Sequence, residues 1–213
     1  MTPLELVQQE YKSSIYLLAK SLLGYKDVNK KTHGEIISCL ESQSKNKLIC
    51  VPRGCLKTSL LIAYVIWILI NNPNARVMIE SQTYTLAANI LREIKVHLLN
   101  KRFIAVFGDW RGNVWNEGEI IISTRTKPMK DPTLKAASVG TVLIGSHFDY
   151  ILYDDMNSLE NINTPENAQK IIDHYKMNTS ILEPNGTTVV LGTRYSELDL
   201  IGFILENEVK QAS

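Results

Sequence analysis

Short apolar segments alternate with helical segments along most of this chain of 213 residues, and this alternation constrains the fold more than any other feature. Parallel strands need crossover connections, usually helices, and strands covered on both faces are apolar throughout. The pattern therefore predicts an α/β fold with a mainly parallel sheet and helices on both faces. The expected helices cover 4–23, 33–43, 58–71, 84–99, 165–177 and 197–207, and the expected strands cover 47–51, 76–80, 150–153 and 187–191.

Cap and turn residues predict where several of these elements begin and end. Gly24 is expected to end the first helix. Thr164-Pro165 is expected to start the helix that follows it, because proline is favoured at the first helical position. Pro184-Asn185-Gly186 predicts a turn before the last strand, and the Gly, Trp, Pro and charged residues of 105–135 favour hairpins and loops.

The composition is that of one ordinary globular domain. With 45% hydrophobic and 21% charged residues, extensive disorder is excluded. The length fits a single domain over 1–213, with N-terminal helices in 1–45 and a core in 46–205. Because 23 Lys and Arg residues nearly cancel 22 Asp and Glu residues, any contact with nucleic acid must rest on a local basic patch.

Two clusters of Lys and Arg could supply such a patch. They lie at 92–102 and 125–135, with Trp110 and Trp115 nearby. Contacts to the phosphate backbone need no reading of bases, so a basic surface would be sufficient. For each cluster an ordinary solvated face is the simpler interpretation, and packing within a hairpin is the simpler interpretation for the tryptophans.

Cysteine usage and hydropathy predict a soluble, cytoplasmic protein with no membrane partner. Cys39, Cys50 and Cys55 form no CxxC pair and no Cys/His metal spacing, which favours a reducing compartment. The N-terminus lacks the basic start and apolar core of a signal peptide. The longest apolar run, Leu60–Ile70, is too short to span a bilayer and predicts a buried helix.

The sharpest local pattern is the turn between the strand over 47–51 and the helix over 58–71. Backbone N–H groups at a helix N-terminus can bind phosphates, Lys57 would bind the β and γ phosphates, and the Thr58 hydroxyl would hold Mg²⁺. The expected ATP-binding residues are Pro52, Arg53, Gly54, Cys55, Leu56, Lys57, Thr58 and Ser59. Because Val51 and Leu56 stand where G-x-x-x-x-G-K-[ST] has glycines, a plain strand-to-helix turn remains the alternative.

A second pattern is the apolar strand Phe148–Asp155, which ends in two acids. In open α/β sheets ligands bind at the carboxyl ends of the strands. Beside the phosphate loop, Asp154 would hold Mg²⁺ and Asp155 would orient or deprotonate the attacking water. Two acids after a strand otherwise begin a solvated loop, and Asp155 is one methylene shorter than the glutamate usual in such ATPases.

A third apolar strand, Thr188–Leu191, leads into Gly-Thr-Arg. Thr193 could sense the γ-phosphate, or the segment could be an ordinary strand end with a turn and a helix cap.

Taken together, the segments resemble the ATPase domain of the large terminase subunit of tailed bacteriophages, the motor that packages DNA into procapsids. Four segments carry this resemblance: Pro52–Thr58 is similar to the deviant Walker A, Tyr150–Asp155 to Walker B, Leu191–Leu200 to the coupling motif, and Val77–Thr83 to a second-strand motif.

The resemblance spans about residues 30–205 and implies a RecA/ASCE-like P-loop NTPase fold with Mg²⁺-dependent ATP hydrolysis. It implies Asp155, Arg53 and Thr193 as catalytic residues, and Thr58 and Asp154 as metal ligands. It also implies translocation of double-stranded DNA into a procapsid. The implied partners are other copies of the chain in a ring on the portal, the portal protein and the small terminase subunit. The implied location is the cytoplasm of the infected bacterial host rather than the mature virion.

The chain also departs from the terminase pattern. Many terminases use an arginine finger in trans, and in several relatives an arginine lies a few residues before Walker B, where this chain reads Gly145-Ser-His-Phe148. Arg125, Arg111 and Arg102 are the remaining candidates for such a finger. His33, and more weakly Gln43, could read adenine, although a histidine at a helix start is usually a cap or a surface residue. Only thirteen residues follow Leu200, so we expect no nuclease domain and no DNA cleavage.

The sequence is compatible with three functions. The first is the terminase motor, the second is a helicase-like or other P-loop NTPase, and the third is a non-catalytic nucleotide-binding assembly module. The missing glycines and the short Asp155 side chain keep the third interpretation open.

Overall fold

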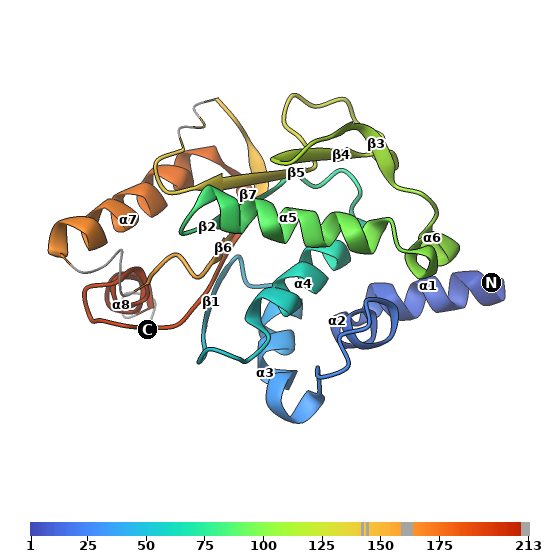
Figure 1. Ribbon diagram of the computed structural model, residues 1–213, viewed down its shortest axis with the longest axis horizontal. Helices are drawn as coiled ribbons and strands as arrows, with labels where there is room; N and C mark the ends of the chain where they lie inside the picture. The colour runs from blue at the N-terminus through green and yellow to red at the C-terminus, as the bar shows by residue number, and fades with distance from the viewer. Residues whose placement is uncertain (142, 144, 159–163, 210–213) are drawn as a thin grey trace.

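The computed structural model describes residues 1–141, 143, 145–158 and 164–209, and contains one seven-stranded sheet with helices around it (Figure 1). The strands are β1 (Asn46–Cys50), β2 (Val77–Ser81), β3 (Arg111–Trp115), β4 (Glu119–Ile122), β5 (Leu134–Ser138), β6 (Phe148–Asp154) and β7 (Leu182–Gly192). The helices are α1 (Pro3–Ser13), α2 (Ile15–Leu17), η1 (Leu18–Leu22), α3 (Lys30–Glu41), α4 (Lys57–Asn71), α5 (Tyr84–Leu98), α6 (Lys101–Phe107), α7 (Pro165–Asn178), η2 (Thr179–Ile181), α8 (Leu200–Ile204) and η3 (Leu205–Val209).

The sheet is mainly parallel, as the sequence predicts. Its strand order is β1-β7-β6-β2-β5-β4-β3. Each neighbouring pair from β1 to β5 runs parallel, whereas β4 and β3 extend the sheet in antiparallel fashion. The expected hairpin within 105–135 is therefore present as β3 and β4.

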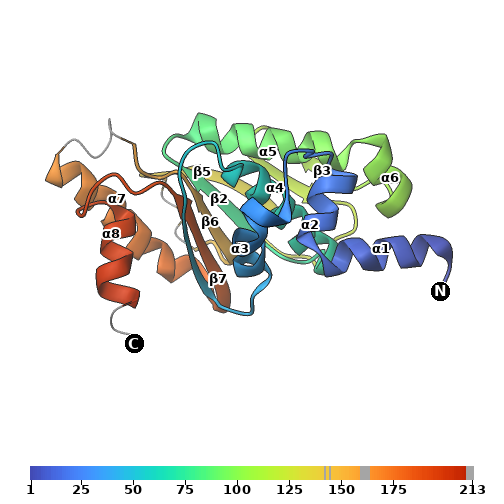
Figure 2. The same cartoon turned by 90° about the horizontal axis from the view of Figure 1, so that it is seen from below.

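Helices cover both faces of the sheet, which confirms the expected α/β architecture. Along β6, Leu152 packs in the core beneath α4 and α5, whereas Ile151 and Tyr153 pack beneath α7 and α8. Figure 2 shows the sheet between these two groups of helices. Because successive side chains of a strand point to opposite faces, strands covered in this way must be apolar throughout.

The central helix α4 is buried on nearly all sides, as the run Leu60–Ile70 predicts. Every residue from Leu60 to Ile70 is buried except Trp67, whose indole N–H donates to the Lys12 carbonyl at 2.8 Å. A helix that is apolar all round belongs in the interior of a protein. In the described part of the chain, no helix is long and apolar enough to cross a bilayer.

The structure corrects the prediction of one continuous helix over 4–23. At Ser14 the backbone is extended, which ends α1, and the Ser14 side chain accepts a hydrogen bond from Leu17 N and so caps α2. The Glu41 carboxylate accepts a second bond from Ile15 N at 2.7 Å. Since Glu41 belongs to α3, a tertiary contact stabilises this break. Gly24, with a φ of 82°, lies just after η1, as expected.

Two strand predictions are corrected as well. β7 already begins at Leu182, and Pro184-Asn185-Gly186 forms an irregularity within it rather than a turn before it. The pairing shifts here because Leu182 lies opposite Phe148 and Thr187 lies opposite Tyr150. No strand was expected over 134–138, and Leu134 and Lys135 fall in the segment predicted as hairpins and loops, yet β5 pairs in parallel with β2.

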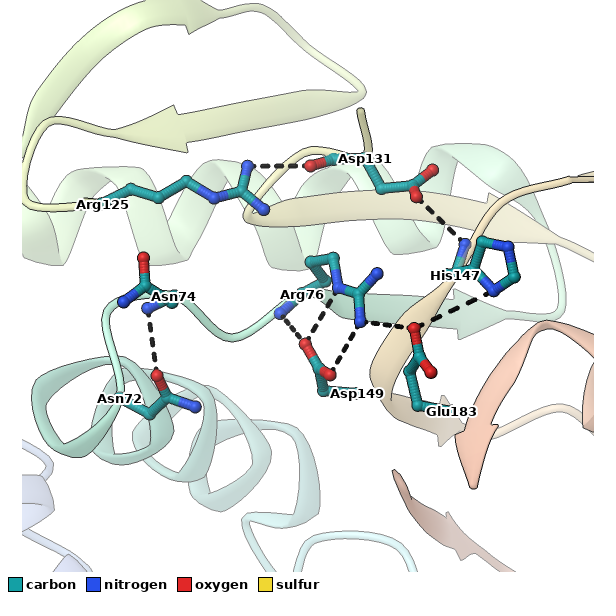
Figure 3. Close-up of polar contacts among 8 residues, drawn as sticks. All are labelled: Asn72, Asn74, Arg76, Arg125, Asp131, His147, Asp149 and Glu183. Atoms are coloured by element: carbon teal, nitrogen blue, oxygen red, sulfur yellow. Dashed lines mark hydrogen bonds and ion pairs between the residues drawn. The ribbon is translucent and has the colours of Figure 1, made fainter. Parts of the chain in front are cut away.

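The edge of the sheet where β2 and β6 begin is held by charged side chains (Figure 3). Arg76 donates two side-chain hydrogen bonds to Asp149, at 2.9 and 3.1 Å, and one to Glu183 at 2.7 Å. The bonds to Asp149 are the main cause of the raised pKa of Arg76. These contacts join β2, β6 and β7 at the edge opposite to their carboxyl ends.

Candidate nucleotide-binding site

The loop between β1 and α4 has the backbone that a phosphate-binding turn requires. Gly54 has a φ of 84°, and Leu56 has a φ of 50°, so both lie in the left-handed region. Glycine reaches this region without steric cost, whereas a residue with a Cβ such as Leu56 does so at a cost of about 1–2 kcal/mol. α4 begins immediately afterwards with no side-chain cap on its N-terminus, which leaves its first N–H groups available to an anion.

Lys57 joins the carboxyl ends of three strands. Its Nζ donates to Thr193 Oγ1 at 2.8 Å and to the Val51 carbonyl at 3.4 Å, and it forms an ion pair with Asp155 Oδ1 at 3.2 Å. Thr193 Oγ1 in turn donates to the same Val51 carbonyl at 3.1 Å. Lys57 is only 5% exposed, so it is a buried residue of the loop and not a solvated surface lysine.

Thr58 and Asp154, the two predicted metal ligands, are in direct contact. Thr58 Oγ1 donates to Asp154 Oδ2 at 2.8 Å, and Ser81 Oγ donates to the Asp154 backbone carbonyl at the same distance. The other carboxylate oxygen, Asp154 Oδ1, is buried and accepts no hydrogen bond from the described residues. Burial is the largest cause that raises the pKa of Asp154 to about 6, and the Thr58 hydrogen bond opposes it.

These two side chains fit the chemistry of Mg²⁺. A hydroxyl and a carboxylate with one unpaired oxygen are the hard oxygen ligands that this ion prefers. Among the described residues, no group of three or more His, Cys, Asp or Glu side chains could hold a metal by itself. Mg²⁺ bound here would therefore complete its coordination with phosphate oxygens and water, as it commonly does in nucleotide sites.

Asp155 turns the chain at the end of β6. Its φ of 44° is left-handed, and its backbone N–H donates to the Leu191 carbonyl at 2.9 Å. Aspartate tolerates this conformation better than most residues because its short side chain can bond locally. The side chain is 39% exposed, so the carboxylate that pairs with Lys57 can still be reached from solvent.

A cavity of about 400 Å³ lies over the phosphate loop. Its lining combines loop, strand-end and helix residues: Arg53, Gly54, Leu56, Lys57, Thr58, Ser59, Gln82, Leu86, Asp155, Asn157 and Ser158. A second cavity of about 540 Å³ shares Thr58, Leu86 and Asp155 with it and continues along α5 to Val96. Both volumes are in the range of small-molecule sites.

The cavity contains most of the predicted ATP-binding residues but not all of them. Pro52 and Cys55 lie in the loop yet outside the lining. Thr193 contacts Lys57 directly, and Asp154 lines the second cavity. The catalytic and binding roles assigned to these residues stay predictions.

The predicted catalytic Arg53 is held by a residue that the sequence did not single out. Arg53 Nε donates to the Tyr195 hydroxyl at 2.9 Å, and its guanidinium lies 5.7 Å from the centre of the tyrosine ring. Tyr195 is itself fixed, because its backbone N–H donates to Asp199 Oδ2 at 2.8 Å. The fully buried Asp199 also caps α8 by accepting from Gly202 N at 2.9 Å. The segment after β7 is thereby bonded to the phosphate loop.

Asn157 and Gln82 are cavity residues that sequence reasoning missed. Gln82 directly follows β2, so the rule that ligands bind at carboxyl strand ends could have identified it. Asn157 comes two residues after Asp155, is 6% exposed, and its Oδ1 accepts no hydrogen bond from the described part of the chain. A buried amide oxygen without a partner costs about 1–3 kcal/mol. No local sequence pattern predicts that this amide oxygen is buried without a partner.

The candidates for reading adenine lie outside both cavities. His33 is buried at the start of α3, where its Nδ1 accepts from the Asn29 N–H at 3.2 Å. This is the helix-start role that the alternative interpretation predicts. Gln43 is exposed just after α3.

The arginine-finger candidates are also remote from this chain's own phosphate loop. Arg125 donates to the Asp131 carbonyl at 2.8 Å and lies near Arg76, at the edge opposite to the loop (Figure 3). Burial and the charge of Arg76 lower the pKa of Arg125. Arg102 on α6 and Arg111 on β3 are exposed. Each could meet a site only on another copy.

Comparison with known proteins identifies similar folds. No protein-family model and no curated protein sequence matches the chain. Among solved structures, S. cerevisiae Dbp5 in a complex with Nup159, Gle1, IP6 and ADP matches with a TM-score of 0.55 and 10% identity, over 90% of this chain and 48% of that one. A DEAD box protein from Methanococcus jannaschii matches with a TM-score of 0.53 and 14% identity, over 90% of this chain and 50% of that one.

The chain thus spans about half the length of each of these neighbours. At such low identity the likeness establishes the fold and nothing more of their biology. Together with the strand order, it confirms the predicted fold class: the chain has a RecA-like α/β fold.

Proposed function

We propose that this chain is a Mg²⁺-dependent ATP hydrolase that binds ATP over the loop between β1 and α4. One observation carries the proposal: the lysine and threonine of the loop meet the two aspartates that end β6. Lys57 pairs with Asp155, and Thr58 bonds Asp154, beside a cavity of about 400 Å³. Sequence spacing alone does not require these contacts.

The contacts of Lys57 suggest how binding prepares the site. Without nucleotide, Lys57 and Asp155 neutralise one another at 3.2 Å. Phosphate oxygens would replace Asp155 as partners of Lys57, which would release the carboxylate to accept a proton from water. Thr58 and Asp154 would hold Mg²⁺, which would neutralise part of the phosphate charge. Arg53 would leave Tyr195 to contact the γ-phosphate, and Thr193 would pass the change to the segment after β7.

At a finer level, we propose that the domain is the motor of a viral large terminase. The Pro-Arg-Gly loop, the Asp-Asp strand end and the Gly-Thr-Arg segment support this assignment. The proposed task is movement of double-stranded DNA into a procapsid by a ring of copies on the portal, with the portal protein and the small terminase subunit as partners. The proposed location is the cytoplasm of the infected host cell.

A helicase-like ATPase is the second candidate, because the structural neighbours named above include a DEAD box protein. The two candidates differ in the polymer that should stimulate turnover. A packaging motor responds to double-stranded DNA, whereas a helicase-like enzyme responds to single strands. ATPase rates measured with double-stranded DNA, single-stranded DNA and single-stranded RNA distinguish them, and equal rates with all three would contradict the packaging assignment.

The decisive test of ATP hydrolysis is Lys57→Ala. A hydrogen bond to a charged group contributes about 1.5–3 kcal/mol, so the loss of Lys57 should weaken ATP binding by at least about tenfold and remove turnover. Calorimetry measures binding, and phosphate release measures turnover. Lys26→Ala, which removes an exposed lysine, serves as the matched control. Unchanged ATP binding by Lys57→Ala would refute the proposed site.

A further inference from the structure

We propose that Asn157 belongs to the catalytic site and that its side-chain carbonyl positions the water that attacks the γ-phosphate. This inference rests on the proposed ATPase function. Asn157 was not among the residues that the sequence patterns identified. Its assignment comes from an unpaired oxygen, from the cavity that it lines, and from the geometry of the neighbouring strand end.

The first observation is a concentration of unpaired acceptors. In the described part of the chain, three of the four residues with a buried, unpartnered side-chain oxygen lie at the end of β6: Asp154, Asp155 and Asn157. The fourth is Thr124, and the remaining unpartnered buried atoms there are two nitrogens of Arg125. Asp154 has a candidate partner in Mg²⁺, and Asp155 has its ion pair with Lys57. For Asn157 Oδ1 the described residues offer no hydrogen-bond donor. Native proteins rarely leave a buried amide oxygen in this state without a ligand or water.

The second observation is the position of Asn157. It is 6% exposed and lines the same cavity as Lys57, Thr58 and Asp155. The left-handed turn at Asp155, fixed by its bond to the Leu191 carbonyl, keeps the residues after β6 at this edge. Asp155 and Asn157 therefore both line this cavity, and each carries a side-chain oxygen that can accept a hydrogen bond.

Two acceptors are what a nucleophilic water requires. Water has two O–H donors, and when both are bound by fixed acceptors, a lone pair is directed away from them. With Asp155 and Asn157 as acceptors, that lone pair would face the γ-phosphorus. The second acceptor also compensates for the short side chain of Asp155, which by itself restrains water less than a glutamate would.

The water oxygen forms a bond to the γ-phosphorus while the bond from that phosphorus to the bridging oxygen of ADP breaks. One water proton passes to the Asp155 carboxylate and later to solvent. The other stays on the phosphate product after its hydrogen bond to Asn157 Oδ1 is released. Asn157 accepts a hydrogen bond throughout and transfers no proton.

The test is Asn157→Leu, which keeps a similar volume and removes the acceptor. We expect single-turnover ATP hydrolysis at saturating ATP to fall at least tenfold, while the Kd values for ATP and ADP change less than twofold. Binding of ADP with aluminium fluoride, which mimics the transition state together with its water, should weaken by a similar factor. The Tm without nucleotide should stay unchanged or rise, because an unpaired buried oxygen has been removed.

Two further variants complete the design. Asn157→Asp keeps the acceptor and should retain more turnover than Asn157→Leu, and it replaces that variant if the leucine prevents folding. Asn113→Leu changes an exposed asparagine of β3 and should leave turnover unchanged. Turnover and aluminium fluoride binding within twofold of wild type in Asn157→Leu would overturn the proposal. So would a lowered Tm with equal losses in ADP and aluminium fluoride binding, since that result indicates a structural role.

The experiments distinguish a failure of the proposed role of Asn157 from a failure of the proposed ATPase function. If wild type binds no ATP, or if Lys57→Ala binds it equally well, the ATPase proposal fails, and the assignment of Asn157 fails with it. If wild type binds ATP but turns over too slowly to measure, the aluminium fluoride comparison decides. If wild type hydrolyses ATP and Asn157→Leu does so equally well, only the inference about Asn157 is refuted.

Discussion

Replacing Asp154 by asparagine should stabilise the nucleotide-free protein at neutral pH. Burial raises the pKa of this carboxyl from its ordinary value of 3.8 to about 6. The folded state therefore binds the proton more tightly than the unfolded state, and keeping the carboxylate ionised at pH 7.5 costs folding stability. The gap between the two pKa values corresponds to about 3 kcal/mol, because each pH unit corresponds to about 1.4 kcal/mol.

Asparagine is never ionised and can still accept the hydrogen bond from Thr58. The sign of the pH dependence follows from the raised pKa. Wild type gains stability as the pH falls through about 6, and the gain is complete below 3.8. The advantage of Asp154→Asn should therefore be about 3 kcal/mol at pH 7.5, about half of that at pH 5, and below about 0.5 kcal/mol at pH 3.8.

Urea denaturation of both proteins at these three pH values measures the difference. Asp27→Asn is the matched control, because Asp27 is exposed, and its effect should be small at every pH. The Asp154→Asn variant should also lose Mg²⁺-dependent turnover, since it removes a metal ligand. A variant that is less stable than wild type at pH 7.5, or a difference that does not change with pH, would refute the reasoning about burial.

Four smaller predictions follow from other contacts. Lys47→Met should lower the free energy of unfolding by about 2–4 kcal/mol, because the buried Nζ donates to three carbonyls at the end of α3; a loss under about 1 kcal/mol in denaturation would contradict this. Gly112→Ala should disrupt the β3–β4 pairing, since a Cβ would lie 2.0 Å from the Ile121 carbonyl oxygen; unchanged amide exchange in this hairpin would exclude it. Tyr195→Phe should release Arg53 and tighten ATP binding about two- to fivefold in calorimetry, whereas weaker binding would show that the contact favours the bound state. EDTA should abolish ATP turnover without changing the Tm of the nucleotide-free protein, and turnover that survives EDTA would exclude Mg²⁺ dependence.

Sequence patterns were sufficient where the structure depends on local periodicity. The apolar strands and the buried helix over Leu60–Ile70 could be predicted because burial on all sides requires apolar side chains at every position. Thr164 and Pro165 begin α7 as expected, because a cap and a first-turn proline act within one turn of helix. The order of strands and helices was then enough to predict the parallel sheet.

Patterns failed where distant residues decide local structure. β5 contains Lys135 and two alanines, a weak strand signal, and it exists as a strand because β2 pairs beside it. The break at Ser14 depends on Glu41 of α3. In both places the partner is remote in sequence, so the neighbouring residues alone cannot predict the strand or the helix break.

The same distinction between local patterns and distant contacts applies to the candidate site. The sequence by itself determined the strand–loop–helix with Lys57 and Thr58 and the two acids that end a strand, because each is a short motif. Only the tertiary structure brought Thr58 to Asp154, held Arg53 against Tyr195, and placed Asn157, with its buried unpaired oxygen, in the lining of the cavity. The physical reason is that strand order and helix packing set the distances between these side chains. Strand order and helix packing depend in turn on the apolar core of the whole chain.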